Sequence, residues 1–277
     1  FRSVDSYFSV LMRVGLAALV FLPFLRTRGQ SPRTIVLYML VGAMQLGIMY
    51  LLAFRAYLYL TVSEFLLFTV FTPLYITLIY DLLSGRKLRW GYLLSAALAV
   101  LGAAIIRYDK VSDHFWTGLL LVQLSNLCFA IGMVGYKRLM EVRPMPQHNA
   151  FAWFYVGAFI VAVAAWFMLG NAQKLPTTTL QWSVLVWLGV VASGLGYFMW
   201  NYGATQVDAG TLGIMNNVHV PAGLLVNLAI WQEQPHWPSF ISGALVILAS
   251  LWVHRRWVAP HSGQTADDRR RGSAQSE

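Results

Sequence analysis

The chain has 277 residues, of which 58% are hydrophobic and 11% are charged, and its formal net charge is +9. A soluble domain has about 25% charged residues, so this chain carries too few charges to cover the surface of a soluble globular protein. The composition therefore excludes an ordinary soluble enzyme. The single cysteine, Cys128, excludes a disulfide framework and a cysteine-rich zinc site.

Nine apolar segments follow one another along the chain, each close to the roughly 20 residues that a helix needs to cross a bilayer. The connections between them are short, and the polar tail 257–277 is expected to be disordered. We therefore predict an all-α polytopic membrane protein. The predicted spans are residues 6–25, 34–54, 62–83, 90–107, 116–136, 149–169, 182–202, 209–231 and 238–254.

The positive charges alternate between the two sides of these spans. Fourteen lysines and arginines lie in the loops after the first, third and fifth spans and in the tail, whereas five lie on the opposite side. The positive-inside rule then places the C-terminus in the cytoplasm. Because topology accounts for the basic charge, we expect no nucleic-acid partner. The five residues of the opposite side are Arg2, Arg55, Arg107, Lys110 and Lys174.

The two halves of the chain repeat each other. Segment 90–101 matches segment 237–248 at a constant offset of 147, and Leu46-Gly47 recurs as Leu195-Gly196. The repeat period is five spans, which is odd, so the two copies would face opposite ways across the membrane, as in many secondary transporters. We predict a first repeat over 1–110 that lacks its first span, a second repeat over 111–256, and a cytoplasmic tail.

Segments 54–64 and 203–213 resemble EamA-type carriers of the drug/metabolite transporter superfamily, and the resemblance covers the chain except for its tail. The Gly-Glu pair that such carriers often show after the fourth and ninth helices is replaced here by Gly85-Arg86 and Gln232-Glu233. Segments 143–149 and 203–223 are similar to the biotin uptake carriers of enterobacterial inner membranes. The resemblance implies a bacterial inner-membrane carrier whose small-molecule substrate is biotin; composition and spacing do not name a substrate.

Polar residues inside apolar spans are costly and are candidate substrate contacts. Arg13 lies deep in the first span, where its guanidinium could bind a substrate carboxylate bidentately or form a structural ion pair with Glu64. Aromatic residues at the start of the sixth span, Trp153 and Tyr155, are interpreted as interface anchors. The other candidate contacts are Gln45, Tyr50, Gln123, Asn126, Trp200, Asn201, Asn216, Asn217 and His219.

Pro73 and Pro221 interrupt corresponding spans of the two repeats, which in transporters indicates the binding site. Proline frees a backbone carbonyl within a helix. Around Pro221, the amides of Asn216 and Asn217 could bind a ureido group, or they could hydrogen-bond neighbouring helices. Glu64 and Asp208 could carry a proton in coupled transport, or they could be acids favoured by a helix N-terminus.

These features favour a secondary carrier that works by alternating access, with biotin as the substrate that the resemblance implies. An exporter of amino acids or other small metabolites is the alternative, because the sequence does not fix the direction of transport. An intramembrane enzyme is disfavoured, since no catalytic motif is present. A non-transporting membrane subunit is a further alternative. We expect no metal and no cofactor.

Overall fold

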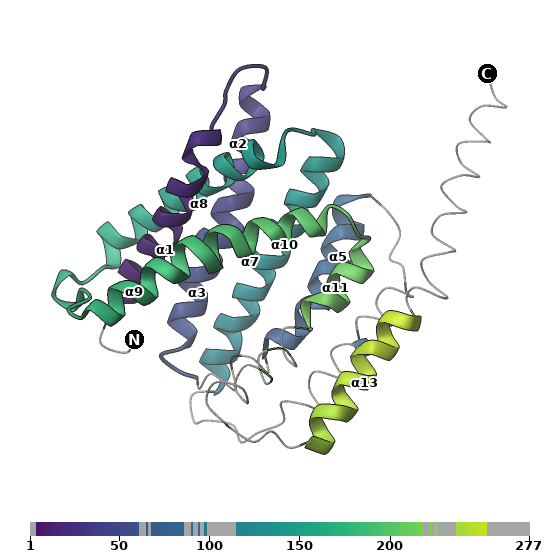
Figure 1. The fold of residues 1–277 in the computed structure, drawn as a ribbon. Coiled ribbons are helices and arrows are strands. Elements are labelled where there is room, and N and C mark those ends of the chain that lie inside the picture. The colour runs from purple at the N-terminus through teal and green to yellow at the C-terminus, as the bar shows by residue number, and fades with distance from the viewer. Residues whose placement is uncertain are drawn as a thin grey trace, which may run out of the picture. The chain divides into compact units, whose positions relative to one another are not determined.

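The computed structural model describes residues 4–60, 65, 68–85, 90, 94, 97–98, 115–218, 222, 225 and 237–253, and every regular element in this part of the chain is helical (Figure 1). The all-α prediction is therefore confirmed for the described residues. The α-helices are α1 (Ser6–Phe21), α2 (Pro32–Gly42), α3 (Met49–Ala56), α5 (Thr72–Leu83), α7 (Phe115–Val142), α8 (Gln147–Leu169), α9 (Thr179–Trp187), α10 (Tyr197–Ala204), α11 (Ala209–Asn216) and α13 (Trp237–Val253). Short 3-10 turns are η1 (Leu22–Phe24), η3 (Thr69–Phe71) and η4 (Ala172–Lys174), and η2 (Ala43–Ile48) and η5 (Leu188–Gly196) are π-helical.

Side-chain caps explain where several of these helices begin. The Asp5 carboxylate accepts the backbone N–H of Phe8 before α1, and Ser31 accepts that of Thr34 before α2. Thr178 and Gln181 form a reciprocal capping box before α9. Each cap satisfies backbone donors that a helix N-terminus leaves without an intrahelical partner.

In the part of the chain that the structure describes, five continuous helical segments are long and apolar enough to cross a membrane, and each coincides with a predicted span. Their exposed side chains are largely apolar, as on Leu19, Leu120 and Phe167, which suits a surface in contact with lipid. The structure describes the other four predicted spans only in part: 62–83 mainly through α5, 209–231 mainly through α11, 238–254 through α13, and 90–107 at four single positions. The five segments are Ser6–Phe24, Pro32–Ala56, Trp116–Val142, Gln147–Leu169 and Thr179–Ala204.

The fifth predicted span ends too early. We placed Lys137 and Arg138 in a loop, but α7 continues through both residues to Val142. The helix continues because the charges find partners along it: Glu141 forms ion pairs with Lys137 one turn earlier and with Arg138. Such pairs at helical spacing stabilise the helix beyond the apolar stretch.

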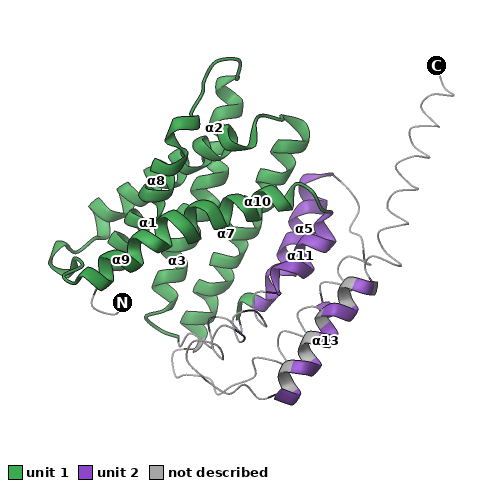
Figure 2. Cartoon of the chain, viewed as in Figure 1, with its two compact units in different colours: residues 1–69, 111–207 green, residues 70–110, 208–277 purple. Residues whose placement is uncertain are grey.

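The chain divides into two compact units (Figure 2). The first consists of residues 1–69 and 111–207, and the second of residues 70–110 and 208–277. Each unit thus takes segments from both sides of the predicted repeat boundary at residue 110. The repeats themselves stay a prediction.

In the first unit, α1 packs on α8 and η5, α2 packs on α8, and α3 packs on α7. Glycines permit the closest of these approaches. A Cβ added to Gly42 would lie 2.8 Å from Phe154 Cα, and one added to Gly157 would lie 2.6 Å from Met39 Cα. Because small residues let helix backbones meet, they are enriched where membrane helices pack.

The two π-helical segments lie in the spans that the predicted repeat relates. The first, η2, interrupts the helix from Pro32 to Ala56, and the second, η5, interrupts the helix from Thr179 to Ala204. The repeated Leu-Gly pair falls within each segment, as Leu46-Gly47 and Leu195-Gly196. π-helical turns are rare in proteins overall, but those that occur are often found at functional sites. The two segments η2 and η5 therefore mark the region of the candidate site.

In the second unit, α5 packs on α11. Pro73 lies in the first turn of α5, directly after the 3-10 turn η3. In the first turn of an α-helix proline is tolerated, because the backbone N–H that it lacks would have no intrahelical partner there. Gly213 of α11 faces Pro73, since an added Cβ would lie 3.3 Å from the Pro73 carbonyl oxygen.

Candidate functional site

Arg13 of α1 is the centre of a polar cluster in the first unit. Its Nε donates to Ser193 Oγ at 3.1 Å and its Nη2 donates to Tyr50 Oη at 2.8 Å. The two hydroxyl oxygens are themselves 3.1 Å apart. The guanidinium carbon also lies 4.5 Å from the centroid of the Tyr50 ring, a cation–π distance. The structure therefore joins two predicted site residues, Arg13 and Tyr50, to one that we did not predict.

Ser193 was missed because a single hydroxyl in an apolar run is ordinarily a packing residue. It lies within η5, where it is fully buried, and Tyr155 of α8 donates its hydroxyl hydrogen to the Ser193 carbonyl. Tyr155 is also fully buried, so its assignment as an interface anchor was wrong. At 1.5 Å per residue, its position eight residues after the start of α8 puts it about 12 Å along the helix.

The two side chains that accept hydrogen bonds from Arg13, those of Tyr50 and Ser193, are both neutral. Within the described part of the chain, the ion pairs are those of Lys137 and Arg138 with Glu141, and neither involves Arg13. Glu64, the ion-pair partner that we weighed, lies outside the described residues. A cation inside an apolar bundle requires a counter-charge or water, and neutral hydroxyls leave the charge itself uncompensated.

Gln45 and Asn201 pair with each other. Gln45 Nε2 donates to Asn201 Oδ1 at 3.0 Å, and Asn201 Nδ2 donates to Gln45 Oε1 at 3.2 Å. Both side chains are fully buried. The pair joins η2 to α10, so it links the two helices that contain π-helical segments. This geometry favours a helix-packing role for both amides.

We expect Gln45→Leu and Asn201→Leu each to lower the free energy of unfolding by about 1–2 kcal/mol, because each leaves one buried amide unpaired. The double variant should lower the free energy of unfolding by less than the sum of the two single variants, since neither amide is then left buried without its partner. Thermal unfolding of detergent-purified protein measures both. Additive losses would show that the two amides do not act as a pair.

Gln123 and Asn126 of α7 both donate to one backbone carbonyl, that of Phe68. The nitrogen-to-oxygen distances are 3.0 Å and 2.9 Å. Phe68 directly precedes η3 and Pro73, where the chain leaves regular helical hydrogen bonding. These amides thus satisfy a backbone acceptor. Trp200, another predicted substrate contact, donates its indole N–H to Met133 Sδ at 2.9 Å.

Asn217 is the most deeply buried of the polar candidates that the structure describes in the second unit. Its Nδ2 donates to the Val70 carbonyl at 3.1 Å, and its buried Oδ1 accepts no hydrogen bond from the described residues. Asn216, the preceding residue, is half-buried at the end of α11. His219 and Pro221 lie outside the described residues.

Asp208 caps α11. Its Oδ1 accepts the backbone N–H groups of Gly210 at 2.9 Å and Thr211 at 3.1 Å, and its Oδ2 accepts the Thr211 hydroxyl at 2.7 Å. This is the geometry of an N-cap, the alternative that we weighed against proton transfer. Proton coupling through Asp208 or Glu64 stays a prediction.

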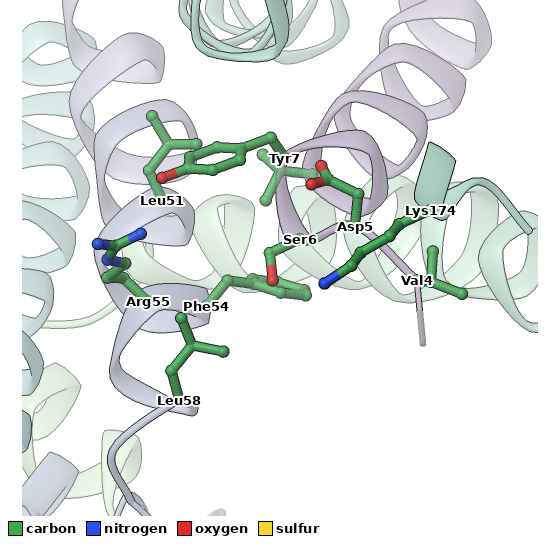
Figure 3. Close-up of a pocket in the computed structure, with 10 residues that line it drawn as sticks. Val4, Asp5, Ser6, Tyr7, Leu51, Phe54, Arg55, Leu58 and Lys174 are labelled. Carbon is green, nitrogen blue, oxygen red and sulfur yellow. The ribbon is translucent and has the colours of Figure 1, made fainter. Parts of the chain in front are cut away.

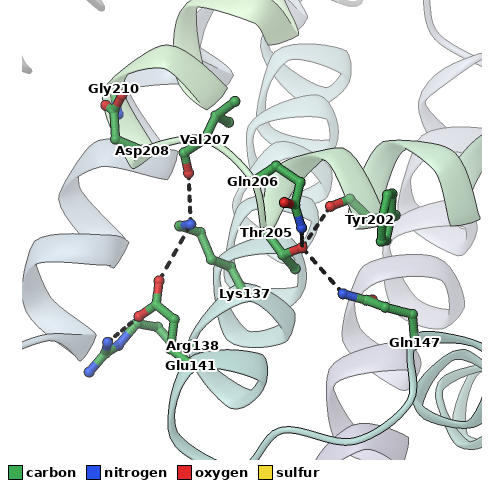
Figure 4. A network of polar contacts seen from close by, with 10 residues as sticks. All are labelled: Lys137, Arg138, Glu141, Gln147, Tyr202, Thr205, Gln206, Val207, Asp208 and Gly210. Atoms are coloured by element: carbon green, nitrogen blue, oxygen red, sulfur yellow. Dashed lines mark hydrogen bonds and ion pairs between the residues drawn. The ribbon is translucent and has the colours of Figure 1, made fainter.

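A second polar network of the first unit surrounds the end of α10 (Figure 4). The buried Lys137 donates from Nζ to the Val207 carbonyl at 2.7 Å, so it binds an acceptor just after the helix. Gln147 donates to Thr205 Oγ1 at 3.2 Å, and Gln206 does so at 2.9 Å. These contacts fix the last residues of the unit to α7 and to the start of α8.

Apolar outer faces, five described segments of membrane-spanning length and an arginine among hydroxyl groups indicate a multi-pass membrane protein with a polar cluster inside its apolar core. The model of the EamA-like transporter family matches residues 1–108 and 116–255. The chain therefore belongs to the EamA-like transporter family, and it is a transporter rather than an enzyme.

Curated relatives share this family with the chain. It is 83% identical over 274 residues to the biotin transporter of Escherichia coli (strain K12), which covers 99% of this chain and 92% of that protein. It is 54% identical over 254 residues to the probable biotin transporter of Pseudomonas aeruginosa PAO1, covering 91% and 88%. A solved crystal structure with 17% identity aligns over 90% of this chain and 88% of its own, with a TM-score of 0.73, which indicates the same fold.

Proposed function

We propose that this protein is a secondary carrier that takes up biotin across the bacterial inner membrane by alternating access. The names of the relatives that are 83% and 54% identical support this substrate. The structural observation that carries the proposal is that Arg13 has neutral hydrogen-bond partners and no ion pair among the described residues. An uptake carrier for an organic acid needs such a cation within its apolar bundle.

Biotin ends in a carboxylate, and a guanidinium is the side chain that matches a carboxylate best. Arg13 has five N–H donors, and two of them are used by Ser193 and Tyr50. The remaining donors are available for a substrate carboxylate. Tyr50 and Ser193 then orient the guanidinium, and the apolar surroundings strengthen its attraction for an anion.

The ureido ring of biotin presents N–H donors, which require acceptors in an apolar site. In the second unit, taken by itself, Asn217 has a buried Oδ1 that accepts no hydrogen bond from the described residues, so Asn217 stays a candidate acceptor. We retain Asn216 and His219 as further candidates, and we assign Gln45, Asn201, Gln123 and Asn126 to helix packing because their amides bind one another or a backbone carbonyl.

We propose the nine-span arrangement with an inverted repeat and a cytoplasmic C-terminus. The alternation of basic loops supports the topology. The two π-helical segments support the repeat, because they interrupt related spans near the same Leu-Gly pair. Pro73, at the start of α5, supports a break in the span that the repeat relates to the one containing Pro221.

Uptake of labelled biotin into cells that lack their own biotin carrier tests the function. We expect saturable uptake that unlabelled biotin inhibits and that the carboxylate-free biotin amide inhibits at least about tenfold less well, since charged hydrogen bonds contribute about 1.5–3 kcal/mol. No uptake by well-expressed protein would reject biotin import. Faster efflux of amino acids from the same cells would then favour the exporter alternative.

A further inference from the structure

A cavity of about 180 Å³ opens at one end of the first unit (Figure 3). The start of α1, the end of α3 and the turn η4 surround it. Basic residues of the chain's less basic side, Arg55 and Lys174, lie on this cavity, so the positive-inside rule assigns it to the non-cytoplasmic face. Its lining residues include Asp5, Leu51, Phe54, Arg55, Leu58 and Lys174.

The charge in this cavity is positive. Arg55 and Lys174 are both exposed and lie on opposite sides of it (Figure 3). Neither belongs to an ion pair with a carboxylate of the described chain. The one acid, Asp5, is occupied as a helix cap: its two oxygens accept the backbone N–H groups of Phe8 and Asn171 at 2.8 Å and 3.2 Å.

Phe54 connects the cavity to the Arg13 cluster. Its ring lies between Arg55 and Lys174 along the cavity (Figure 3), and its centroid is 6.0 Å from the Arg13 guanidinium carbon. The same ring packs edge-on against Tyr50, with centroids 6.2 Å apart. A single aromatic side chain therefore borders both the cavity and the charged cluster within the bundle.

We propose that this cavity is an entry site that binds the carboxylate of an amphipathic organic acid before the acid reaches Arg13. Arg55 and Lys174 attract the carboxylate, and the side chains of Leu51, Phe54 and Leu58 contact its apolar chain. Phe54 forms the partition that the substrate passes on its way to Arg13. The inference rests on the proposed uptake of a carboxylate substrate.

The test is initial-rate uptake of labelled biotin into right-side-out membrane vesicles by the variants Arg55→Gln, Lys174→Gln and their combination. Both residues are exposed, so the variants should fold. We expect the double variant to raise KM about three- to tenfold with Vmax changed by less than about twofold, because exposed charge pairs contribute modestly and steer association. Arg28→Gln, which removes an exposed cation outside the cavity, is the matched control and should leave KM unchanged.

The dependence of KM on ionic strength gives a second readout, because Arg55 and Lys174 would not affect it if their role were purely structural. Between about 10 mM and 150 mM salt the screening length falls from about 30 Å to 8 Å, so KM should rise with salt in the unmodified protein and much less in the double variant. An unchanged KM and salt response in the double variant, with biotin still taken up, would overturn the entry site and leave the proposed function intact. Absence of uptake by the unmodified protein would overturn both.

Discussion

Arg13→Ala is expected to reduce biotin uptake about ten- to hundredfold at equal expression, because the variant removes the cation that we assign to the substrate carboxylate. Charged hydrogen bonds contribute about 1.5–3 kcal/mol, which sets this range. Arg13→Lys keeps the charge but loses the planar fork that matches a carboxylate, so we expect an intermediate loss. Labelled uptake in carrier-deficient cells measures both variants.

Thermal stability separates this role from a structural one. A structural ion pair would leave an unpaired carboxylate when Arg13 is replaced, and the variant would unfold at a lower temperature. In the structure, Tyr50 and Ser193 already lie within hydrogen-bonding distance of each other and can pair without Arg13. We therefore expect Arg13→Ala to keep its unfolding temperature. Full uptake by this variant, or a large loss of stability, would contradict the assignment, and Arg28→Ala in an exposed loop is the control.

Gly157→Ala is expected to destabilise the protein by about 3 kcal/mol, at the upper end of the cost of overpacking a core. The added Cβ would lie 2.6 Å from Met39 Cα and would also overlap the carbonyl of that residue. Because backbone atoms obstruct the new methyl group, no side-chain rotation relieves the clash, and α2 must move away from α8. The unfolding temperature in detergent and the monodisperse fraction after extraction measure the effect.

Gly203→Ala is the matched control for this prediction. Gly203 is also a helical glycine, in α10, but an added Cβ there meets no atom within 4 Å. Alanine favours a helix over glycine by about 1 kcal/mol, so this variant should be as stable as the parent or slightly more stable. Equal stability of the two alanine variants would refute the close approach of α2 and α8.

The sequence was informative about the spans because membrane insertion depends on long apolar runs, and such runs are visible without a structure. The basic end of α7 was less predictable. Lys137 lies in a charged segment of the sequence, yet its ammonium is satisfied by the Val207 carbonyl, 70 residues away. The contact with Val207 has no local pattern in the sequence, whereas the helical spacing of Lys137 and Glu141 does and was overlooked when the span was predicted to end at residue 136.

The candidate site could be predicted in part, because some of its residues are unusual for the segments in which they lie. Arg13 stands out because a cation in an apolar span is rare. Ser193 does not stand out, and its role depends on a π-helical segment that composition does not reveal. Gln45 and Asn201 were predicted as substrate contacts because they are polar residues within apolar spans, but the sequence could not show that they bind each other across 156 positions.

The separation of Arg13 from its two hydroxyl partners along the chain has a consequence for biosynthesis. An arginine at the centre of a membrane helix opposes insertion by about 2.5–3.5 kcal/mol. Tyr50 is made 37 residues after Arg13, and Ser193 is made 180 residues after it. At about 5–20 residues per second, the ribosome delivers the first partner within about 2–7 s and the second only after about 9–36 s. The span that contains Arg13 is therefore synthesised before either of its hydroxyl partners, and its contact with η5 is among the last that the nascent chain can make.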